Sequence, residues 1–351
     1  MYWKFIRHKL AIIALPIVII LLIIAVFCEF LAPHTREVRF VDYKHAPPNG
    51  IRFIDSTGRF HLMPFIYDLD RETDPHTFRR TFEKDTSIKY DMGFFVRGEP
   101  YKLWGIFSSN IHFFGAKDSS APYFVMGTDQ LGRCIFSRAI YGTRVSLGFA
   151  GLGVFFTFII GITLGGLSGY LGGITDTIVQ RVIDLLLCVP HIPLWMALAA
   201  ALPQSWTSVQ IYFGMLLVMS CISWTGLARI VRGKILSIRE EDFTTAARLS
   251  GASDFRIIFK HMLPSFASML IVHITISIPA TILGETALSF LGLGLQPPVV
   301  SWGVLLQDAQ TVQALGLHPW LLLPCLFVII TVLSFNFMGD GLRDAADPYT
   351  R

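Results

Sequence analysis

The side chains best placed to do chemistry are ionisable residues in or beside long apolar stretches of the sequence. Glu285 stands in an otherwise apolar stretch, and Glu29 lies close to the end of another. Arg181 and Asp184 lie three residues apart, a spacing that lets them pair on one face of a helix. Ionisable residues embedded in a membrane bind charged solutes or relay protons. This set leaves a secondary transporter possible, but it is thin for a proton-coupled carrier, which needs several embedded carboxylates.

Sequence motifs that mark enzymes and metal sites are missing from the chain. A phosphate-binding loop needs Ser or Thr after Gly-Lys, whereas Gly233-Lys234 is followed by Ile235. His191 and His273 lie near apolar stretches, where a packed or pore-lining role is favoured over metal ligation. The cysteines are too far apart for a zinc or redox site: Cys28, Cys134, Cys188, Cys221 and Cys325. The sequence therefore predicts no catalytic residue, no cofactor and no metal in this chain.

The composition predicts that these residues are held in a membrane protein. Of the 351 residues, 53% are hydrophobic and 15% are charged, against about 25% charged in a soluble domain. Such a chain has too few polar side chains to cover the surface of a soluble protein. The net charge of +4 is small and no basic run carries interleaved aromatic residues, which argues against a nucleic-acid partner.

Six apolar stretches are close to the length of about 20 residues with which a helix crosses a bilayer. They are 10–32, 145–170, 179–202, 209–230, 265–288 and 320–338. The first is longer than the apolar core of a signal peptide and lacks a cleavage site, so we expect it to be retained. Lys4, Arg7 and Lys9 precede it, and the segment between the fourth and fifth stretches is also rich in Lys and Arg. Both observations place the amino terminus, that segment and the carboxyl terminus in the cytoplasm.

The segment between the first two stretches, 33–144, is more polar and predicts a small external lobe that contains β-strands. Residues 51–55 and 59–63 flank Ser-Thr-Gly and favour a hairpin. Residues 94–96 and 101–104 flank Arg-Gly-Glu-Pro and favour a second hairpin. A merely solvated loop is the alternative.

The second stretch is rich in glycines, several of them three or four residues apart. They are Gly148, Gly151, Gly153, Gly161, Gly165, Gly166 and Gly169. Small residues at such spacings let helix backbones approach closely inside a membrane. We therefore expect this span at the centre of a helix bundle.

The cytoplasmic segment between the fourth and fifth stretches predicts two short helices hinged at a glycine. Ser237 opens a capping box that would start the first helix, and Gly251 ends it. Ser253 caps a second helix, which we expect to end before Pro264.

The first of these helices carries apolar side chains on an otherwise polar segment. Phe243, Ala246 and Ala247 suit insertion into the groove of a partner protein. The alternative is an amphipathic helix that lies on the lipid surface. The residue pattern alone leaves these two interpretations open.

The same segment resembles the EAA loop of ABC importer permeases. Residues 241–253 carry the match, with Ala246, Ala247 and Gly251 in their usual places and Thr245 where an acidic residue is usual. In that family the loop forms the coupling helix that docks into a groove of the cytoplasmic ATPase. The resemblance implies an ATPase-coupling role for Glu241, Asp242, Phe243, Thr245, Ala246, Ala247, Arg248 and Gly251.

Three further motifs resemble the C-type subunit of the dipeptide and oligopeptide permeases. They lie at 127–147, with Cys134 in place of the usual aspartate, at 284–303 and at 341–348. Together with the EAA loop, these motifs cover the chain from residue 127 to its end, and the first span also matches. The external segment 34–123 is longer than in the simplest members of the family.

The resemblance implies an all-α polytopic membrane protein with six transmembrane helices. These form a MetI-like permease core of five helices plus an N-terminal helix, with a small external β-containing insert. The implied division is 1–32 for the N-terminus and first helix, 33–144 for the insert and 145–351 for the permease core. The coupling segment is 233–264.

The implied function is that of the permease subunit of an ATP-driven importer of di- and oligopeptides in the bacterial inner membrane. Its implied partners are a homologous second permease, one or two cytoplasmic ABC ATPase subunits that bind the ATP, an external solute-binding protein and membrane lipid. Glu285, Trp302 and Asp308 are candidates for the translocation path or its external gate, although an ordinary interhelical hydrogen bond is favoured for Glu285. Nickel chelates or oligosaccharides are alternative substrates within the same class, and a proton-coupled secondary carrier is the alternative outside it.

Overall fold

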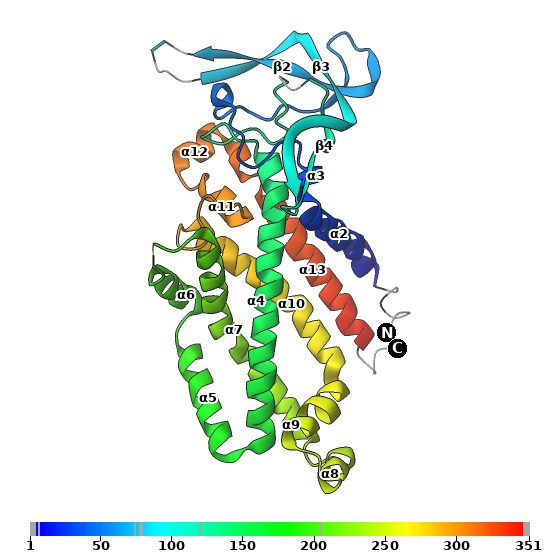
Figure 1. The fold of residues 1–351 in the computed structure, drawn as a ribbon, viewed down its shortest axis with the longest axis vertical. Coiled ribbons are helices and arrows are strands. Elements are labelled where there is room, and N and C mark those ends of the chain that lie inside the picture. The colour runs from blue at the N-terminus through cyan, green and yellow to red at the C-terminus, as the bar shows by residue number, and fades with distance from the viewer. Residues whose placement is uncertain are drawn as a thin grey trace.

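The computed structural model describes residues 5, 8–73, 75–76, 80–118, 121–203 and 205–346. The helices form an elongated bundle, with a β-sheet at one end and the short helix α8 (Asp242–Leu249) at the other (Figure 1). The first and last of the long helices, α2 (Lys9–Val26) and α13 (Cys325–Ala346), lie side by side (Figure 1). Some residues used in the sequence analysis lie outside the described residues. They are Lys4 and Arg7, on which the predicted orientation partly rests, and Asp347 and Pro348 of the last motif.

Five helices in the described part of the chain are long and apolar enough to cross a membrane, or six if one bent pair counts as a span. The five are α2 (Lys9–Val26), α4 (Ile135–Leu171), α7 (Ser208–Ile238), α10 (Ala267–Phe290) with the turns before it, and α13 (Cys325–Ala346) with the turn before it. Together with the small antiparallel sheet described below, they confirm the fold class predicted from the sequence.

The third apolar stretch is a bent pair of helices in place of a continuous one. α5 (Gly173–Cys188) and α6 (His191–Ala200) meet at 89°. Pro190 accounts for the break, because a proline disfavours the helical conformation of the residue before it and lacks an N–H for the helix ladder. Val189 accordingly has extended backbone angles, with φ −101° and ψ 131°.

Helix α4 lies at the centre of the bundle, as its glycines predict, and packs along α7. A Cβ atom added at Gly165 would lie 2.5 Å from the carbonyl oxygen of Ala228. A Cβ atom added at Gly161 would lie 2.9 Å from the side chain of Leu227, and one added at Gly169 would lie 2.9 Å from the carbonyl oxygen of Arg232. These three glycines, four residues apart, form one stripe along which the α4 and α7 backbones approach.

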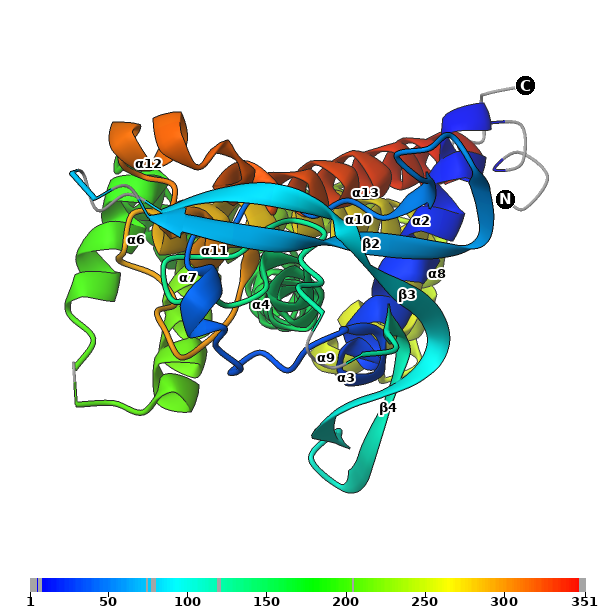
Figure 2. The same ribbon diagram turned by 90° about the horizontal axis from the view of Figure 1, so that it is seen from above.

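The sheet has four antiparallel strands in the order β1-β2-β3-β4. They are β1 (Arg52–Ile54), β2 (Phe60–Thr73), β3 (Arg80–Leu103) and β4 (Phe107–Ala116). β1 and β2 form the first predicted hairpin, whose turn contains Gly58 with φ +83°. The sheet lies across the top of α4 and α11 (Trp302–Gln307), so the insert is a structured lobe and not a solvated loop (Figure 2).

The second predicted hairpin was placed wrongly. β3 continues through Arg-Gly-Glu-Pro, which forms an irregularity in its pairing with β4 between Arg97 and Tyr101 and makes no turn. The chain reverses later, where Trp104 and Gly105 have φ of +53° and +76° and supply the positive angles of a tight turn. The composition signalled a turn, but the strand pairing absorbed Gly98 and Pro100 as a bulge.

Short helical elements complete the fold. They are α3 (Cys28–Leu31), η1 (Val41–Tyr43), α9 (Asp254–Arg256), η2 (Ile257–Met262), η3 (Leu263–Phe266), α12 (Val312–Leu317) and η4 (Pro319–Leu322). η2 is a π-helical turn, and η1, η3 and η4 are 3₁₀ turns.

Candidate functional site

The predicted coupling residues lie on α8, which projects at the end of the bundle opposite the sheet (Figure 1). The helix follows Glu241, whose backbone is extended, and the chain turns away at Gly251, where φ is +76°. The predicted start at a Ser237 capping box was wrong. α7 runs on to Ile238, so Ser237 lies in its last turn and donates to the carbonyl of Lys234 at 2.8 Å.

Two side chains of α8 hold it against the membrane helices. Thr244 is fully buried, and its hydroxyl donates to the carbonyl of Ile238 at 3.0 Å. Ala247 is buried in an apolar cluster with Ile235 of α7 and Ile257 of η2. Ala247 was expected to face a partner protein and instead faces the core. Thr244 was not singled out from the sequence, since its role depends on a carbonyl six residues earlier.

The rest of α8 is exposed and carries large apolar side chains among polar ones. Phe243 and Leu249 are 42% and 85% exposed, and Phe255 beyond the hinge is 61% exposed. Leu249 and Phe255 were missed in the sequence, although they are large apolar residues in a polar segment. The other exposed coupling candidates are Glu241, Asp242, Thr245, Ala246 and Arg248. Arg248 also places its guanidinium 5.7 Å from the ring centroid of Tyr170, at the end of α4.

The chain beyond Gly251 leads into the membrane without a flexible loop. Ser253 caps α9 as predicted, accepting a hydrogen bond from the Arg256 N–H at 3.4 Å. The second helix was expected to end before Pro264, but η2 and η3 continue it into α10. Pro264 lies in the first turn of η3, where a missing N–H costs little. Helical turns therefore connect the chain continuously from Asp254 to α10.

Two of the three candidate path residues meet inside the bundle. Glu285 of α10 is 2% exposed and accepts hydroxyl hydrogen bonds from Ser289 at 2.8 Å, Ser301 at 2.7 Å and Ser146 at 3.4 Å. Trp302 is fully buried, and its backbone N–H donates to the same Ser146 hydroxyl at 3.2 Å. These bonds join α4, α10 and α11. The oxygens of Glu285 are thus used within the chain.

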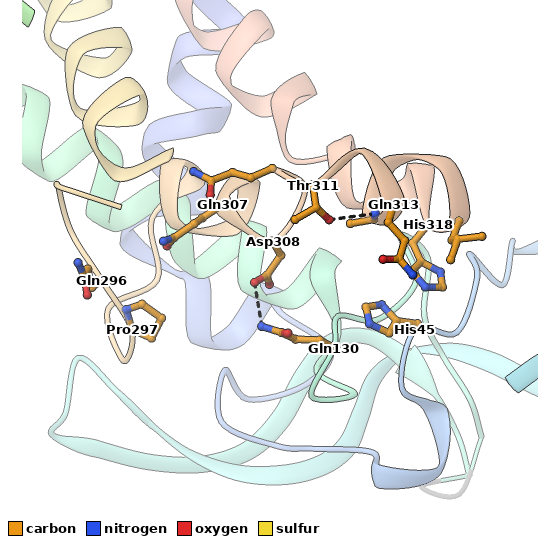
Figure 3. A pocket seen from close by; sticks show the side chains of 12 residues that line it. His45, Gln130, Gln296, Pro297, Gln307, Asp308, Thr311, Gln313 and His318 are labelled. Carbon is orange, nitrogen blue, oxygen red and sulfur yellow. Dashed lines mark hydrogen bonds between the residues drawn. The ribbon is translucent and has the colours of Figure 1, made fainter. Parts of the chain in front are cut away.

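Asp308 lies apart from this pair, beside a polar cavity of about 580 Å³ on the sheet side (Figure 3). The side-chain amide of Gln130 donates to its carboxylate at 3.2 Å. The pKa of Asp308 is raised above its ordinary value, first by burial and then by the nearby charge of Asp129. The positive charges of Arg138 and Arg133 oppose this rise and do not cancel it. The cavity is lined largely by amide and imidazole side chains, among them His45, Gln130, Gln296, Gln307, Gln310, Gln313 and His318.

The charged residues of the first and third stretches pair with other helices. Arg144 of α4 forms a two-bond pair with Glu29 of α3, at 2.5 and 2.7 Å. Asp184 of α5 lies 3.9 Å from Arg181, as its spacing predicts, and also binds Arg229 of α7. In the described residues, no group of three or more His, Cys, Asp or Glu side chains is arranged to hold a metal ion.

Comparison with known proteins decides the family. Residues 161–351 match the family model described as the binding-protein-dependent transport system inner membrane component, and residues 1–48 match the N-terminal TM domain of oligopeptide transport permease C. The chain belongs to this permease family. This confirms the resemblance drawn from the sequence motifs, and the permease is one subunit of a transport system in the inner membrane.

Curated relatives are similar to the permease over most of their length. The dipeptide transport system permease protein of Bacillus subtilis is 39% identical over 226 residues, which are 64% of this chain and 68% of that one. The oligopeptide transport system permease protein of Haemophilus influenzae is 39% identical over 238 residues, 66% of this chain and 74% of that one. Among solved structures, an inward-facing MetNI methionine ABC transporter aligns with a TM-score of 0.46 at 20% identity, over 60% of this chain and 96% of that one.

Proposed function

We propose that this permease carries peptides across the membrane in an ATP-driven importer, and that α8 is the element on which a separate ATPase docks. The observation that carries the proposal is the position of α8. It lies at the extreme end of the bundle and is anchored inward by Thr244 and Ala247, and it exposes Phe243 and Leu249. A short helix that exposes large apolar side chains, with no surface covering them in the described chain, suits a groove in another protein.

The mechanism follows from what α8 contacts. Closure of an ATP-bound ATPase dimer favours one of two arrangements of the membrane helices. A push on α8 reaches α10 through η2 and η3, α7 through Ala247 and α4 through Arg248. The glycine stripe packs α4 closely on α7, and the hydrogen bond from Ser146 to Glu285 ties α4 to α10, so the push on α8 is shared by the three helices. The nucleotide stays in the ATPase, and this chain supplies neither a catalytic residue nor a cofactor.

Peptides are the proposed substrates because relatives of similar length are named for dipeptide and oligopeptide transport. A further relative, 39% identical over 223 residues, is named for glutathione, itself a small peptide. We propose that a solute-binding protein delivers the peptide at the sheet side, and that Asp308 and the cavity beside it lie near the entrance. Glu285 and Trp302 brace the helices that line the path.

The assembly proposed is a complex of this permease with a homologous second permease, one or two ATPase subunits and the binding protein. The sheet and α8 lie at opposite ends of the bundle, so they face opposite sides of the membrane. We place α8 and both chain termini in the cytoplasm and the sheet outside, in accord with the Lys and Arg count of the α8 segment.

The test is Gly251→Val, measured as ATP hydrolysis and peptide uptake by the reconstituted complex. Gly251 has φ +76° with no other group within 4 Å of an added Cβ, so the change introduces backbone strain without a clash. Strain of about 1–3 kcal/mol at such a position shifts the end of α8. We expect ATP hydrolysis to continue while uptake per ATP falls by about tenfold or more.

The matched control is Gly58→Val, in the turn between β1 and β2. Gly58 has φ +83° and equally open surroundings, so it introduces the same local strain at the other end of the molecule. Its uptake per ATP should equal that of the wild type. Equal coupling in the two variants, with the ATPase still recovered with the complex, would refute the role of the α8 segment.

A further inference from the structure

The hairpin of β3 and β4 exposes an unusually apolar surface for part of a lobe outside the helix bundle. Its exposed large side chains are Phe94 (64%), Phe95 (65%), Trp104 (48%), Ile106 (73%) and Phe107 (60%). Single exposed apolar residues are ordinary, but a contiguous apolar patch marks a surface that meets a protein or a membrane. The question is which of these the hairpin meets.

The turn of the hairpin touches the end of the first membrane helix. The indole N–H of Trp104 donates to the carbonyl of Val26 at 2.7 Å, and its ring centroid lies 5.7 Å from that of Phe27. Val26 ends α2, whose 18 residues span about 27 Å at 1.5 Å per residue. This length is close to the hydrocarbon thickness of about 30 Å. Trp104 therefore lies where hydrocarbon gives way to headgroups, the depth that tryptophan favours.

The rest of the aromatic surface lies about one helical turn higher. Phe95 and Phe113 pack on Phe30 of α3, with ring centroids 6.1 and 5.8 Å apart. Phe30 follows Val26 by four residues, about 6 Å along a helix, and the headgroup layer is about 5–8 Å thick. Seen from above, the hairpin extends sideways beyond α3, away from the other helices (Figure 2). The whole patch thus fits within the depth of one headgroup layer.

The side of α2 that leads up to the hairpin turn is apolar and uncovered within the described chain. Ile20, Ile23 and Val26 of α2 are 55%, 48% and 45% exposed, on a helix with a mean hydropathy of 3.1. The aromatic patch continues this uncovered apolar surface upward across Phe27. Exposed Lys102 on the hairpin, with Arg36 and Arg144, lines a cavity of about 520 Å³ at the same level, where Glu29 and Glu37 also lie. Arg144 is paired with Glu29 and Arg36 with Glu37, so exposed Lys102 is the cation placed beside the aromatic belt to meet a phospholipid headgroup.

We propose that the β3–β4 hairpin is embedded in the headgroup layer of the leaflet at the C-terminal end of α2. The occupant of its apolar surface is phospholipid. Insertion of Trp104, Ile106 and Phe107 ties the lobe to the membrane surface, so the lobe cannot swing away from the helices below it. This anchor does not depend on which solute the permease carries or on the role of α8.

The first experiment replaces Ile106 with a photoreactive benzoylphenylalanine in the complete transporter in native membranes. Ile106 is highly exposed, so the substitution leaves the packing of the lobe intact. The control position is Leu62, 87% exposed near the start of β2, the strand at the top of the molecule in Figure 1. We expect phospholipid adducts at residue 106 in several-fold excess over residue 62. Adducts to another protein chain at residue 106, or equal lipid yields at the two positions, would overturn the proposal.

The second experiment measures quenching of tryptophan fluorescence by lipids brominated at shallow or deep positions of the acyl chain, in the purified complex in nanodiscs. The difference in fluorescence between the wild-type complex and the Trp104→Phe complex is the emission of Trp104. It is thereby separated from the emission of the other six tryptophans of the permease and of those in the other subunits. We expect this difference signal to be quenched at least twofold more by the shallow bromines than by the deep ones. A Trp104 signal that neither lipid quenches places the hairpin in water and rejects the anchor.

Discussion

Replacing Gly165 by alanine tests the packing on which the transmission from α8 depends. The added Cβ would lie 2.5 Å from the carbonyl oxygen of Ala228 and 2.8 Å from its Cα, whereas ordinary contacts begin at 3.4 Å. Both atoms belong to the backbone of α7 and cannot rotate away, so α4 and α7 must separate by about 0.9 Å. A radial gap of about 0.5–1 Å forfeits a quarter to a half of each contact energy along the stripe.

The expected cost of this overpacking is about 1–3 kcal/mol. Alanine also removes the helix penalty of glycine, about 1 kcal/mol, so the variant must be compared with an alanine that meets nothing. Gly151 lies on the same helix, and no atom comes within 4 Å of its added Cβ. We expect Gly165→Ala to be less stable than Gly151→Ala by about 1–3 kcal/mol.

The assay is thermal unfolding of the purified permease in detergent, followed by uptake in the reconstituted complex. Gly165→Ala should unfold several degrees below Gly151→Ala and should lose uptake per ATP, because α4 and α7 no longer move together. Unfolding midpoints that coincide for the two variants would refute the close approach of these helices. Normal uptake with a lowered midpoint would leave the packing intact and reject its part in transmission.

Two other predictions concern carboxylates with different partners. Glu285→Gln should retain stability and uptake, because an amide oxygen still accepts hydrogen bonds from the buried serine hydroxyls. Glu285→Ala should lower the free energy of unfolding by about 1–3 kcal/mol for each hydroxyl left without an acceptor. Thermal unfolding and peptide uptake are the measurements. Hydrogen bonds from His61, then Thr57 and Lys89, hold the pKa of Asp55 well below its ordinary value of 3.8. The ionised form therefore stabilises the β1–β2 turn fully above about pH 3.8, and this stability is lost as the pH falls further. Hydrogen-exchange protection of this turn should show that loss.

Each of these predictions has an outcome that contradicts it. A Glu285→Gln protein that is stable but transports nothing would place the carboxylate on the path, the role for which the sequence made it a candidate beside an interhelical hydrogen bond. For Asp55, the comparison is Asp55→Asn, which should already be less protected at neutral pH and lose little more on acidification. An acid-dependent loss of protection that is the same in the wild type and the variant would assign the effect to other carboxyls.

The sequence by itself determined the elements whose cause is local. A bilayer requires about 20 apolar residues per helix, so the apolar stretches could be read from composition, although the break of the third at Pro190 was not predicted. The glycine stripe of α4 follows from spacing, as does the Ser253 cap, because each involves residues within a few positions along one helix. The EAA-like segment was found by its residues, and its helix lies at the end of the bundle as a docking element requires.

Tertiary structure decided whatever depended on a partner far away in the chain. Pairing with β4 extended β3 through Gly98 and Pro100 and moved the turn to Trp104 and Gly105. Packing on α7 and η2 turned Ala247 inward. Three serines brought together from separate elements occupy the oxygens of Glu285. Local propensity cannot specify such choices. The conformational preference of a residue is worth at most about 1 kcal/mol, which is less than the free energy that burial and hydrogen bonding with the distant partner supply.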